Sequence, residues 1–228
     1  MQRTGKVQVN AAERTPKLIN LLILGATGLV GRNALEQALA EPNIAAVIAP
    51  TRSPLKSHRK LTNPVARDLD SLLPAVITWP VTAVLCALGT TIAKAGSRKA
   101  FRHVDYELPL AFARAAYEQS ATTFALVSAV GASPSSRFFY ARVKGELERD
   151  TSLVGFKSLT VVRPSIIGGE RDEVRRGESA ALFLARVLSP ILPRRFHINP
   201  AANIARALLD AIIADTAGTH MVPSTELV

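Results

Sequence analysis

The sequence predicts an α/β fold in which helices cover both faces of a doubly wound parallel sheet. Apolar runs alternate with helix-like segments along the 228 residues, as in chains that build βαβ units. The apolar runs are continuous rather than alternating, which is typical of strands buried on both faces. The first run leads directly into the glycine-rich turn Gly25-Ala-Thr-Gly28-Leu-Val-Gly31, and a helix-compatible segment follows it.

The elements follow from short apolar runs for strands and longer segments of helix-forming residues for helices. The expected strands are Leu18–Leu24, Ala45–Thr51, Val81–Leu88, Thr123–Ser128 and Leu159–Arg163, with a shorter one near Pro64–Arg67. The expected helices are Leu29–Ala40, Val104–Gln119, Tyr140–Asp150, Ala180–Leu188 and Ala202–Ala214. Glycine, proline and serine cluster between these elements and separate them.

One stretch without charge, from Ser71 to Ala93, is long enough to cross a membrane. Pro74, Pro80 and four threonines interrupt it, so a buried strand preceded by a turn is the better interpretation, and no membrane partner is expected.

The chain length fits one well-buried domain and is short for two. We expect residues 1–16 to form a flexible tail, because they are polar and lack a helical or strand period. Residues 17–228 are expected to form a single domain, in which residues 164–228 make a small substrate-side lobe.

Composition limits the compartment and the partners. The only cysteine, Cys86, lies in an apolar run, which excludes an internal disulfide and indicates an inert core thiol. The N-terminus has no apolar core of a secretory signal, so a cytoplasmic location is expected. The net charge of +10 admits a nucleic acid or a membrane, and it fits an anionic dinucleotide equally well.

The glycine turn predicts a nucleotide site. Gly25 permits the tight turn, Gly28 lets the backbone approach a pyrophosphate, and Gly31 lets the helix pack against the strand. The first N–H groups of the helix, with its positive dipole end, bind the anion. The turn residues expected at the cofactor are Gly25, Thr27, Gly28, Leu29, Val30 and Gly31.

The residue after the expected second strand is Arg52, where an NAD site places a carboxylate for the ribose hydroxyl. A guanidinium suits a 2′-phosphate instead, which favours NADP over NAD as the cofactor. Lys56, Arg59 and Lys60 follow, and a solvated basic loop is the alternative interpretation, which fits Arg59 and Lys60.

Two further segments belong to the predicted cofactor site. Asp68 and Leu69 follow the short third strand and are placed at the adenine, with a surface turn as the alternative. Leu88, Gly89, Thr90 and Thr91 end the fourth strand, where the carboxyl edge of the sheet lines the cofactor crevice. The two threonine hydroxyls are expected to bind ribose or phosphate.

The residues Ser128, Tyr140 and Lys144 carry the predicted chemistry. Tyr140 and Lys144 stand four residues apart, so they share one face of a helix. A neighbouring ammonium favours the phenolate, and the phenol then gives its proton to a carbonyl oxygen or takes it from an alcohol. Ser128 ends the expected fifth strand and polarises the same oxygen, while Lys144 orients the ribose.

With these residues in place, the chain resembles the atypical short-chain dehydrogenase/reductases, a family with an NAD(P)-binding Rossmann fold, over residues 18–228. The subgroup that includes the human Tat-interacting oxidoreductase-like protein and its bacterial relatives is similar in three segments: Ala87-Leu-Gly-Thr-Thr91, Ser128-Ala-Val-Gly-Ala132 and Tyr140-Ala-Arg-Val-Lys-Gly-Glu146. The later Val162-Arg-Pro-Ser165 resembles the family's strand that turns under the nicotinamide. The resemblance implies Ser128, Tyr140 and Lys144 as the catalytic triad, and it adds cofactor contacts from Pro164, Ser165 and Ile166.

One departure from the family concerns proton transfer. Many members place an asparagine in the helix after the fourth strand, where it anchors a water in a proton relay to the lysine. This chain has Asp105 there, and an ionised carboxylate accepts a hydrogen bond but donates none.

These observations predict a cytoplasmic NADP-dependent oxidoreductase that acts on a small-molecule carbonyl or alcohol. The alternative is a non-catalytic NADP(H) sensor that binds a protein partner. A third possibility is an assembly factor or isomerase that chaperones a partner complex. A group of arginines fits a solvated surface, an anionic substrate or, with less support, nucleic acid: Arg171, Arg175, Arg176, Arg194 and Arg195. The four histidines are scattered without ligand spacing, so no metal is expected.

Overall fold

The structure is a computed structural model that describes residues 18–169 and 197–228. The predicted tail at residues 1–16, the predicted helix Ala180–Leu188 and the arginines between 171 and 195 lie outside the described residues.

Seven strands form one parallel sheet in the order β3-β2-β1-β4-β5-β6-β9. Their bounds are β1 (Ile19–Leu24), β2 (Ile44–Ile48), β3 (Leu61–Thr62), β4 (Ala83–Cys86), β5 (Thr123–Val127), β6 (Ser158–Arg163) and β9 (Gly218–Pro223). A second parallel pair consists of β7 (Ile166–Gly168) and β8 (Ile198–Pro200). The doubly wound sheet predicted from the apolar runs is therefore confirmed.

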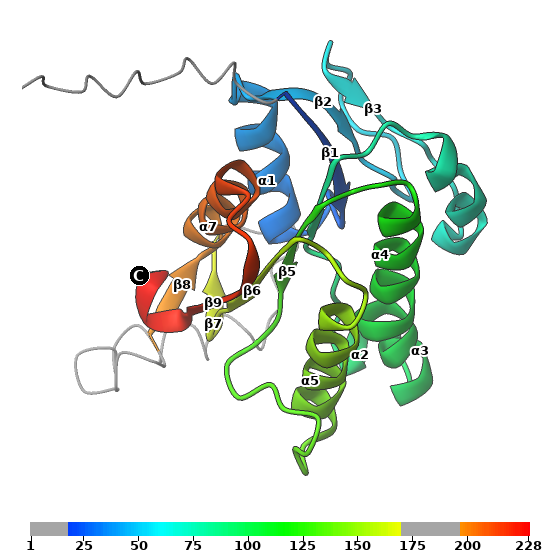
Figure 1. Cartoon of the computed structure of the whole chain (residues 1–228). Coiled ribbons are helices and arrows are strands. Elements are labelled where there is room, and N and C mark those ends of the chain that lie inside the picture. The colour runs from blue at the N-terminus through cyan, green and yellow to red at the C-terminus, as the bar shows by residue number, and fades with distance from the viewer. Residues whose placement is uncertain (1–17, 170–196) are drawn as a thin grey trace, which may run out of the picture.

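The longer helices are α1 (Leu29–Ala40), α4 (Leu108–Glu118), α5 (Phe139–Ser152) and α7 (Ala201–Ala214). Shorter elements are the 3-10 helix η1 (Leu69–Thr78), α2 (Ile92–Ala95), α3 (Arg98–Arg102), the π-helical turn η2 (His103–Glu107) and the 3-10 turn η4 (Ser224–Glu226). Figure 1 shows α1 and α7 on one side of the sheet and α4 and α5 on the other.

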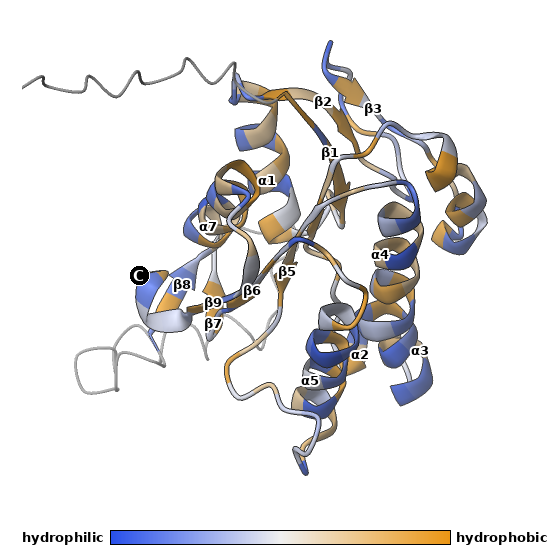
Figure 2. Ribbon diagram, in the orientation of Figure 1, coloured by the Kyte–Doolittle hydropathy of each residue, from blue (hydrophilic) through white to orange (hydrophobic). Residues whose placement is uncertain are grey.

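Each face of the sheet is covered by its own apolar layer. Along β4, Ala83 and Leu85 pack into the layer with α1 and α7, whereas Val84 and Cys86 pack into the layer with α4 and α5. Figure 2 shows apolar colour along the strands and polar colour on the outer sides of α3 and α5. Burial on both faces explains why the strands read as continuous apolar runs.

The structure differs from the predicted elements at the edges of the sheet. The strand expected near Pro64–Arg67 is reduced to β3 and an isolated bridge between Thr51 and Val65. Strand β9 was not predicted, because its side chains are half-buried or exposed and carry no apolar run. Within the predicted lobe at residues 164–228, α7 packs against α1 and β9 joins the main sheet.

The strand order reverses between β1 and β4, since the chain moves from β1 toward β2 and β3 and then returns to β4. At such a switch point the loops after neighbouring strands diverge and leave a crevice at the carboxyl edge of the sheet. The turn after β1 and the loop after β4, residues 87–91, meet at this point.

Candidate active site

A cavity of about 610 Å³ opens at this carboxyl edge, a size within the usual range of ligand sites. Eleven of its lining residues were predicted from the sequence: Thr27, Gly28, Leu29, Val30, Leu88, Gly89, Thr90, Thr91, Ser128, Tyr140 and Lys144. The parallel sheet therefore brings residues as far apart in the chain as Thr27 and Lys144 into one site.

The turn between β1 and α1 depends on glycine. Gly25 has a φ of +85°, and a Cβ there would lie 2.6 Å from the carbonyl oxygen of Ala87. A Cβ on Gly31 would lie 1.9 Å from the carbonyl oxygen of Gly25. Both positions exclude a side chain, so the turn lies tightly between β4 and the start of α1.

The N-terminus of α1 lies at the cavity through Gly28, Leu29 and Val30. The first turn of this helix has neither a side-chain cap nor an acidic residue. Its first N–H groups and its positive dipole end therefore suit a bound anion.

Ser128 follows β5 and lines the cavity with its side chain buried. Its backbone N–H donates to the carbonyl of Val162 at 2.8 Å, but its hydroxyl has no hydrogen-bond partner among the described residues. A buried hydroxyl without a partner is unusual in a folded protein, and this one is available to a ligand in the cavity.

Helix α5 presents Tyr140 and Lys144 to the cavity in different environments. Tyr140 is 42% exposed, and its ring packs 5.7 Å from the ring of Phe101, measured between centroids. Lys144, one turn later, is only 4% exposed. The prediction that both lie on one face of one helix is confirmed.

Asp105 in η2 is the partner of Lys144. Its Oδ1 lies 2.8 Å from the Lys144 Nζ, and its Oδ2 accepts the backbone N–H of Thr90 at 2.8 Å. Burial by itself lowers the pKa of Lys144, but the charge of Asp105 and then that of Tyr140 outweigh it and raise this pKa above its ordinary value. Lys144 therefore stays protonated throughout the neutral range.

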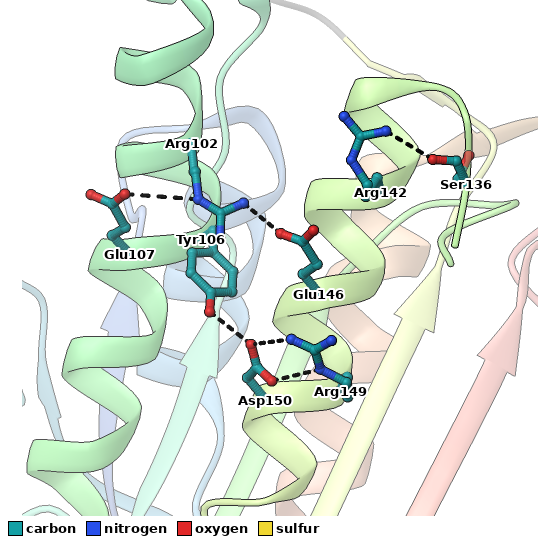
Figure 3. A network of polar contacts seen from close by, with 8 residues as sticks. All are labelled: Arg102, Tyr106, Glu107, Ser136, Arg142, Glu146, Arg149 and Asp150. Atoms are coloured by element: carbon teal, nitrogen blue, oxygen red, sulfur yellow. Dashed lines mark hydrogen bonds and ion pairs between the residues drawn. The ribbon is translucent and has the colours of Figure 1, made fainter. Parts of the chain in front are cut away.

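Polar contacts hold α5 against the helical segment before it, as Figure 3 shows. Arg102 forms an ion pair with Glu146 and lies over the ring of Tyr106, with its guanidinium carbon 4.1 Å from the ring centroid. The hydroxyl of Tyr106 donates to Asp150 at 2.7 Å. These contacts bring the part of the chain that carries Asp105 next to the helix that carries Lys144.

Arg52, Asp68 and Leu69 do not line the cavity. Arg52 is exposed directly after the bridge residue Thr51. Asp68 caps η1 by accepting the backbone N–H of Asp70 at 3.1 Å, as the surface-turn alternative predicts. Lys60 donates to the carbonyl of Glu41 at 2.7 Å.

The predicted contacts Pro164, Ser165 and Ile166 do not line the cavity either. The next residue, Ile167, does. The backbone N–H of Ser165 donates to the Asn199 Oδ1 at 2.8 Å, and its hydroxyl donates to the carbonyl of His197. Ser165 therefore fixes the start of β7 to β8.

Several lining residues were not predicted from the sequence: Arg32, Ala87, Lys94, Val127 and Ile167. Asp105 was noted there but not assigned to the site. Arg32 follows the last glycine of the turn, and Lys94 follows the β4 loop. Because both residues follow segments that were assigned to the cofactor site, their positions in the sequence could have predicted them.

Other groups do not contribute to the site. Burial raises the pKa of the Cys86 thiol to about 11, so the thiol is inert at neutral pH. Within residues 18–169 and 197–228, side chains form no group suited to hold a metal ion. In the same ranges, every helix is too short or too polar to cross a membrane.

The fold and the crevice define the chain as a Rossmann-fold protein. Its structure is similar to that of the Bordetella bronchiseptica enzyme WbmH in complex with NAD+, with a TM-score of 0.67 and 16% identity, covering 90% of this chain and 74% of that one. It is also similar to a short chain dehydrogenase family protein from Francisella tularensis, with a TM-score of 0.66 and 13% identity, covering 92% and 98% of the two chains. No protein-family model matches the sequence.

Sequence relatives identify the family more closely. The mitochondrial protein fmp52 of Aspergillus clavatus is 35% identical over 204 residues, which cover 85% of this chain and 87% of that protein. The mitochondrial protein FMP52 of Saccharomyces cerevisiae is 35% identical over 183 residues, which cover 78% and 79% of the two chains. The chain belongs to the Fmp52 family.

These relatives correct the expected location of the protein and the subgroup that the sequence was expected to resemble. They are named mitochondrial proteins, so the prediction of a cytoplasmic location is wrong. A lone cysteine excludes an internal disulfide but does not distinguish between compartments that keep thiols reduced. The relatives carry the Fmp52 name rather than that of the Tat-interacting subgroup.

Proposed function

We propose that the chain is an NADP-dependent oxidoreductase of the short-chain type, acting on a carbonyl or alcohol. One observation carries the proposal: Ser128, Tyr140 and Lys144 line the same cavity as the glycine turn. A plain strand–helix turn has no need of a phenol, a buried ammonium and an unpartnered hydroxyl beside it.

The residues present fit a dinucleotide. The glycine turn leaves no room for a Cβ at Gly25 or Gly31, and the start of α1 suits a pyrophosphate. The charged lining residues are the cations Arg32, Lys94 and Lys144 and the carboxylate Asp105. This excess of positive charge favours a ligand with several negative charges.

The bound cofactor supplies or accepts the hydride. In the direction of reduction, Tyr140 gives its phenolic proton to the carbonyl oxygen. The hydroxyl of Ser128 donates a hydrogen bond to the same oxygen and stabilises its developing negative charge. Lys144 stabilises the phenolate by its positive charge and holds the ribose in the correct orientation.

The second candidate is the NADP(H) sensor that binds a protein partner. Asp105 favours it, because an ionised carboxylate stands where the resembling enzymes use an asparagine in their proton relay. A sensor shares the cofactor site but has no need of Tyr140, so one substitution separates the two functions.

The test titrates the protein with NADPH and NADH by cofactor fluorescence, then follows oxidation with a panel of carbonyl compounds. Tyr140→Phe should lower turnover by about a hundredfold or more and leave the cofactor affinity nearly unchanged. Tyr117→Phe is the matched control, because Tyr117 is also 42% exposed and lies outside the cavity.

Each result decides between the candidates. Turnover that survives Tyr140→Phe removes the proposed role of this residue. Tight binding without turnover on any compound selects the sensor. Absence of binding by either cofactor overturns both.

A further inference from the structure

The buried carboxylate of Asp105 lies in the wall of the cavity. Its Oδ2 accepts a hydrogen bond, and its Oδ1 is held by the ion pair with Lys144. The residue is 1% exposed, with Oδ1 beside the Lys144 Nζ and Oδ2 on the Thr90 N–H, each at 2.8 Å. A Cβ added to Gly89 would lie 3.4 Å from Oδ1 and 3.8 Å from Nζ. The ion pair therefore lies directly under the backbone of the β4–α2 loop.

The local backbone places this carboxylate where an ordinary α-helix would not. Residues His103–Glu107 form a π-helical turn between α3 and α4. A π-turn inserts one extra residue and changes the direction of the side chains that it carries, and such turns are frequent at functional sites. Here the turn carries its only buried residue, Asp105, toward Lys144.

We propose that Asp105 is a positioning residue that holds Lys144 as a fixed cation under the β4–α2 loop, while Tyr140 exchanges its proton directly with solvent. The part that concerns the proton of Tyr140 rests on the proposed function, whereas the role of Asp105 in holding Lys144 does not depend on it. Three elements are joined by the contact: η2 through Asp105, α5 through Lys144 and the β4–α2 loop through Thr90.

The protonation states of the two partners exclude a relay through them. An ionised Asp105 has no proton to donate. Three groups face Lys144: Asp105 from η2, Tyr140 from α5 and Cys86 from the end of β4, and all three act to raise its pKa. An ammonium held in this way keeps its proton at neutral pH and passes none to Tyr140.

Tyr140 has a route of its own, because it is 42% exposed and lines the open cavity. In reduction, a bound reduced nicotinamide would supply the hydride for the new C–H bond. The Tyr140 O–H bond breaks as the carbonyl oxygen gains its proton. The resulting phenolate then takes a proton from water or a buffer acid, which becomes hydroxide or the conjugate base.

The first test measures the ion pair without any need for activity. The protein is labelled with [13C]lysine, and the Lys144 Cε resonance, assigned by its loss in Lys144→Arg, is followed against pH. In Asp105→Asn the midpoint should move to lower pH by about one unit or more, because burial remains and the opposing charge is gone. An unchanged midpoint overturns the proposal.

Asp215→Asn is the matched control. Asp215 lies 2.9 Å from the Lys157 Nζ, outside the cavity, so removing its charge should leave the Lys144 resonance unmoved. Should Asp105→Asn fail to fold, the double variant Asp105→Asn with Lys144→Met removes both buried charges. It should fold better than the single variant, because no uncompensated ammonium remains, and equal or lower stability contradicts the ion pair.

The second test is the pH dependence of kcat/KM with NADPH and an active carbonyl. In Asp105→Asn the alkaline limb should move to lower pH as Lys144 loses its proton earlier, and kcat should fall more than KM rises. A loss of stability with an unchanged pH profile means that Asp105 is only structural.

The two tests distinguish failure of the proposed function from failure of the proposed role of Asp105. A shifted Lys144 titration without turnover in any variant keeps the ion pair and removes the oxidoreductase. Turnover that depends on Tyr140 with an unshifted Lys144 titration keeps the enzyme and removes the role of Asp105.

Discussion

At the scale of single residues, the proposed preference for NADP rests on Arg52. Its exposed guanidinium follows Thr51 at the carboxyl end of β2, the neighbour of β1 in the sheet. It makes no ion pair with any other residue in the described ranges, so it is available to a phosphate at this edge. A charge-assisted pair with a 2′-phosphate contributes about 1.5 to 3 kcal/mol.

Arg52→Ala should therefore weaken NADPH binding by about tenfold to a hundredfold and leave NADH binding nearly unchanged. Cofactor fluorescence titrations measure both affinities. Arg59→Ala, a change of an exposed cation in the same loop, should affect neither. Equal losses for the two cofactors would contradict the proposed preference for NADP.

Residues whose chemistry is local to a motif were predictable, and residues fixed by distant contacts were not. The glycine turn and the pair Tyr140 and Lys144 depend on spacing within one element, which the sequence displays. Asp68 binds a backbone group of η1, and Ser165 binds the carbonyl of His197 just before β8. Both contacts depend on where those elements lie. The family resemblance marks the position of Asp105 near the lysine, but its burial and its direct ion pair with Lys144 follow from the packing of η2 on α5.

At the scale of elements, His103 links the 3-10 helix η1 to the start of α4. Its Nδ1 lies 3.1 Å from Glu107 and its Nε2 lies 2.8 Å from Asp70. The hydrogen bond to Glu107 raises the pKa of His103, burial partly opposes it, and the bond to Asp70 adds to it. The folded state therefore binds the proton more tightly than the unfolded state does.

This link should make stability depend on pH in a defined direction. The contribution of His103 is fully present below its ordinary pKa and is lost as the pH rises through the raised, folded-state value. Urea unfolding of the wild type should show this loss, and His103→Gln should lack that part of the dependence. His58→Gln changes an exposed histidine of the β2–β3 loop. This control variant should show the same pH dependence of stability as the wild type. Identical pH slopes in wild type and His103→Gln would remove the link.

The elements that the sequence predicted well are those with a strong apolar signal. Helix α1 has the predicted bounds, Leu29–Ala40, and the five central strands differ from their predicted bounds only near the ends. Helices α2 and α3 are four and five residues long, too short to show a period. Strand β9 lies at the edge of the sheet, where it pairs with β6 alone, and its exposed side chains give no apolar run in the sequence.

At the scale of the whole molecule, the cavity joins segments from much of the chain, so its ligand should stabilise the fold as a unit. NADPH at a hundred times its Kd stabilises the native state by about 2.7 kcal/mol. For a domain of this size the gain raises Tm by about 5 to 10 °C. Scanning calorimetry should show one transition, as the prediction of a single domain over residues 17–228 requires, and this transition should move with NADPH. Two transitions, one of which does not move with NADPH, would contradict the single domain.

The contact between α1 and α7 has a consequence for biosynthesis. Ala34 and Ala38 of α1 share an apolar layer with Ile204 and Leu208 of α7, and Figure 1 shows the two helices side by side. More than 150 residues separate these helices in the sequence. On the ribosome, the part of α1 that packs against α7 therefore stays uncovered until almost the whole chain has been made, although β1 and β2 are available earlier to the rest of its apolar side. A nascent chain that stalls before Ala201 exposes this surface, and chaperones that bind apolar segments should capture it there.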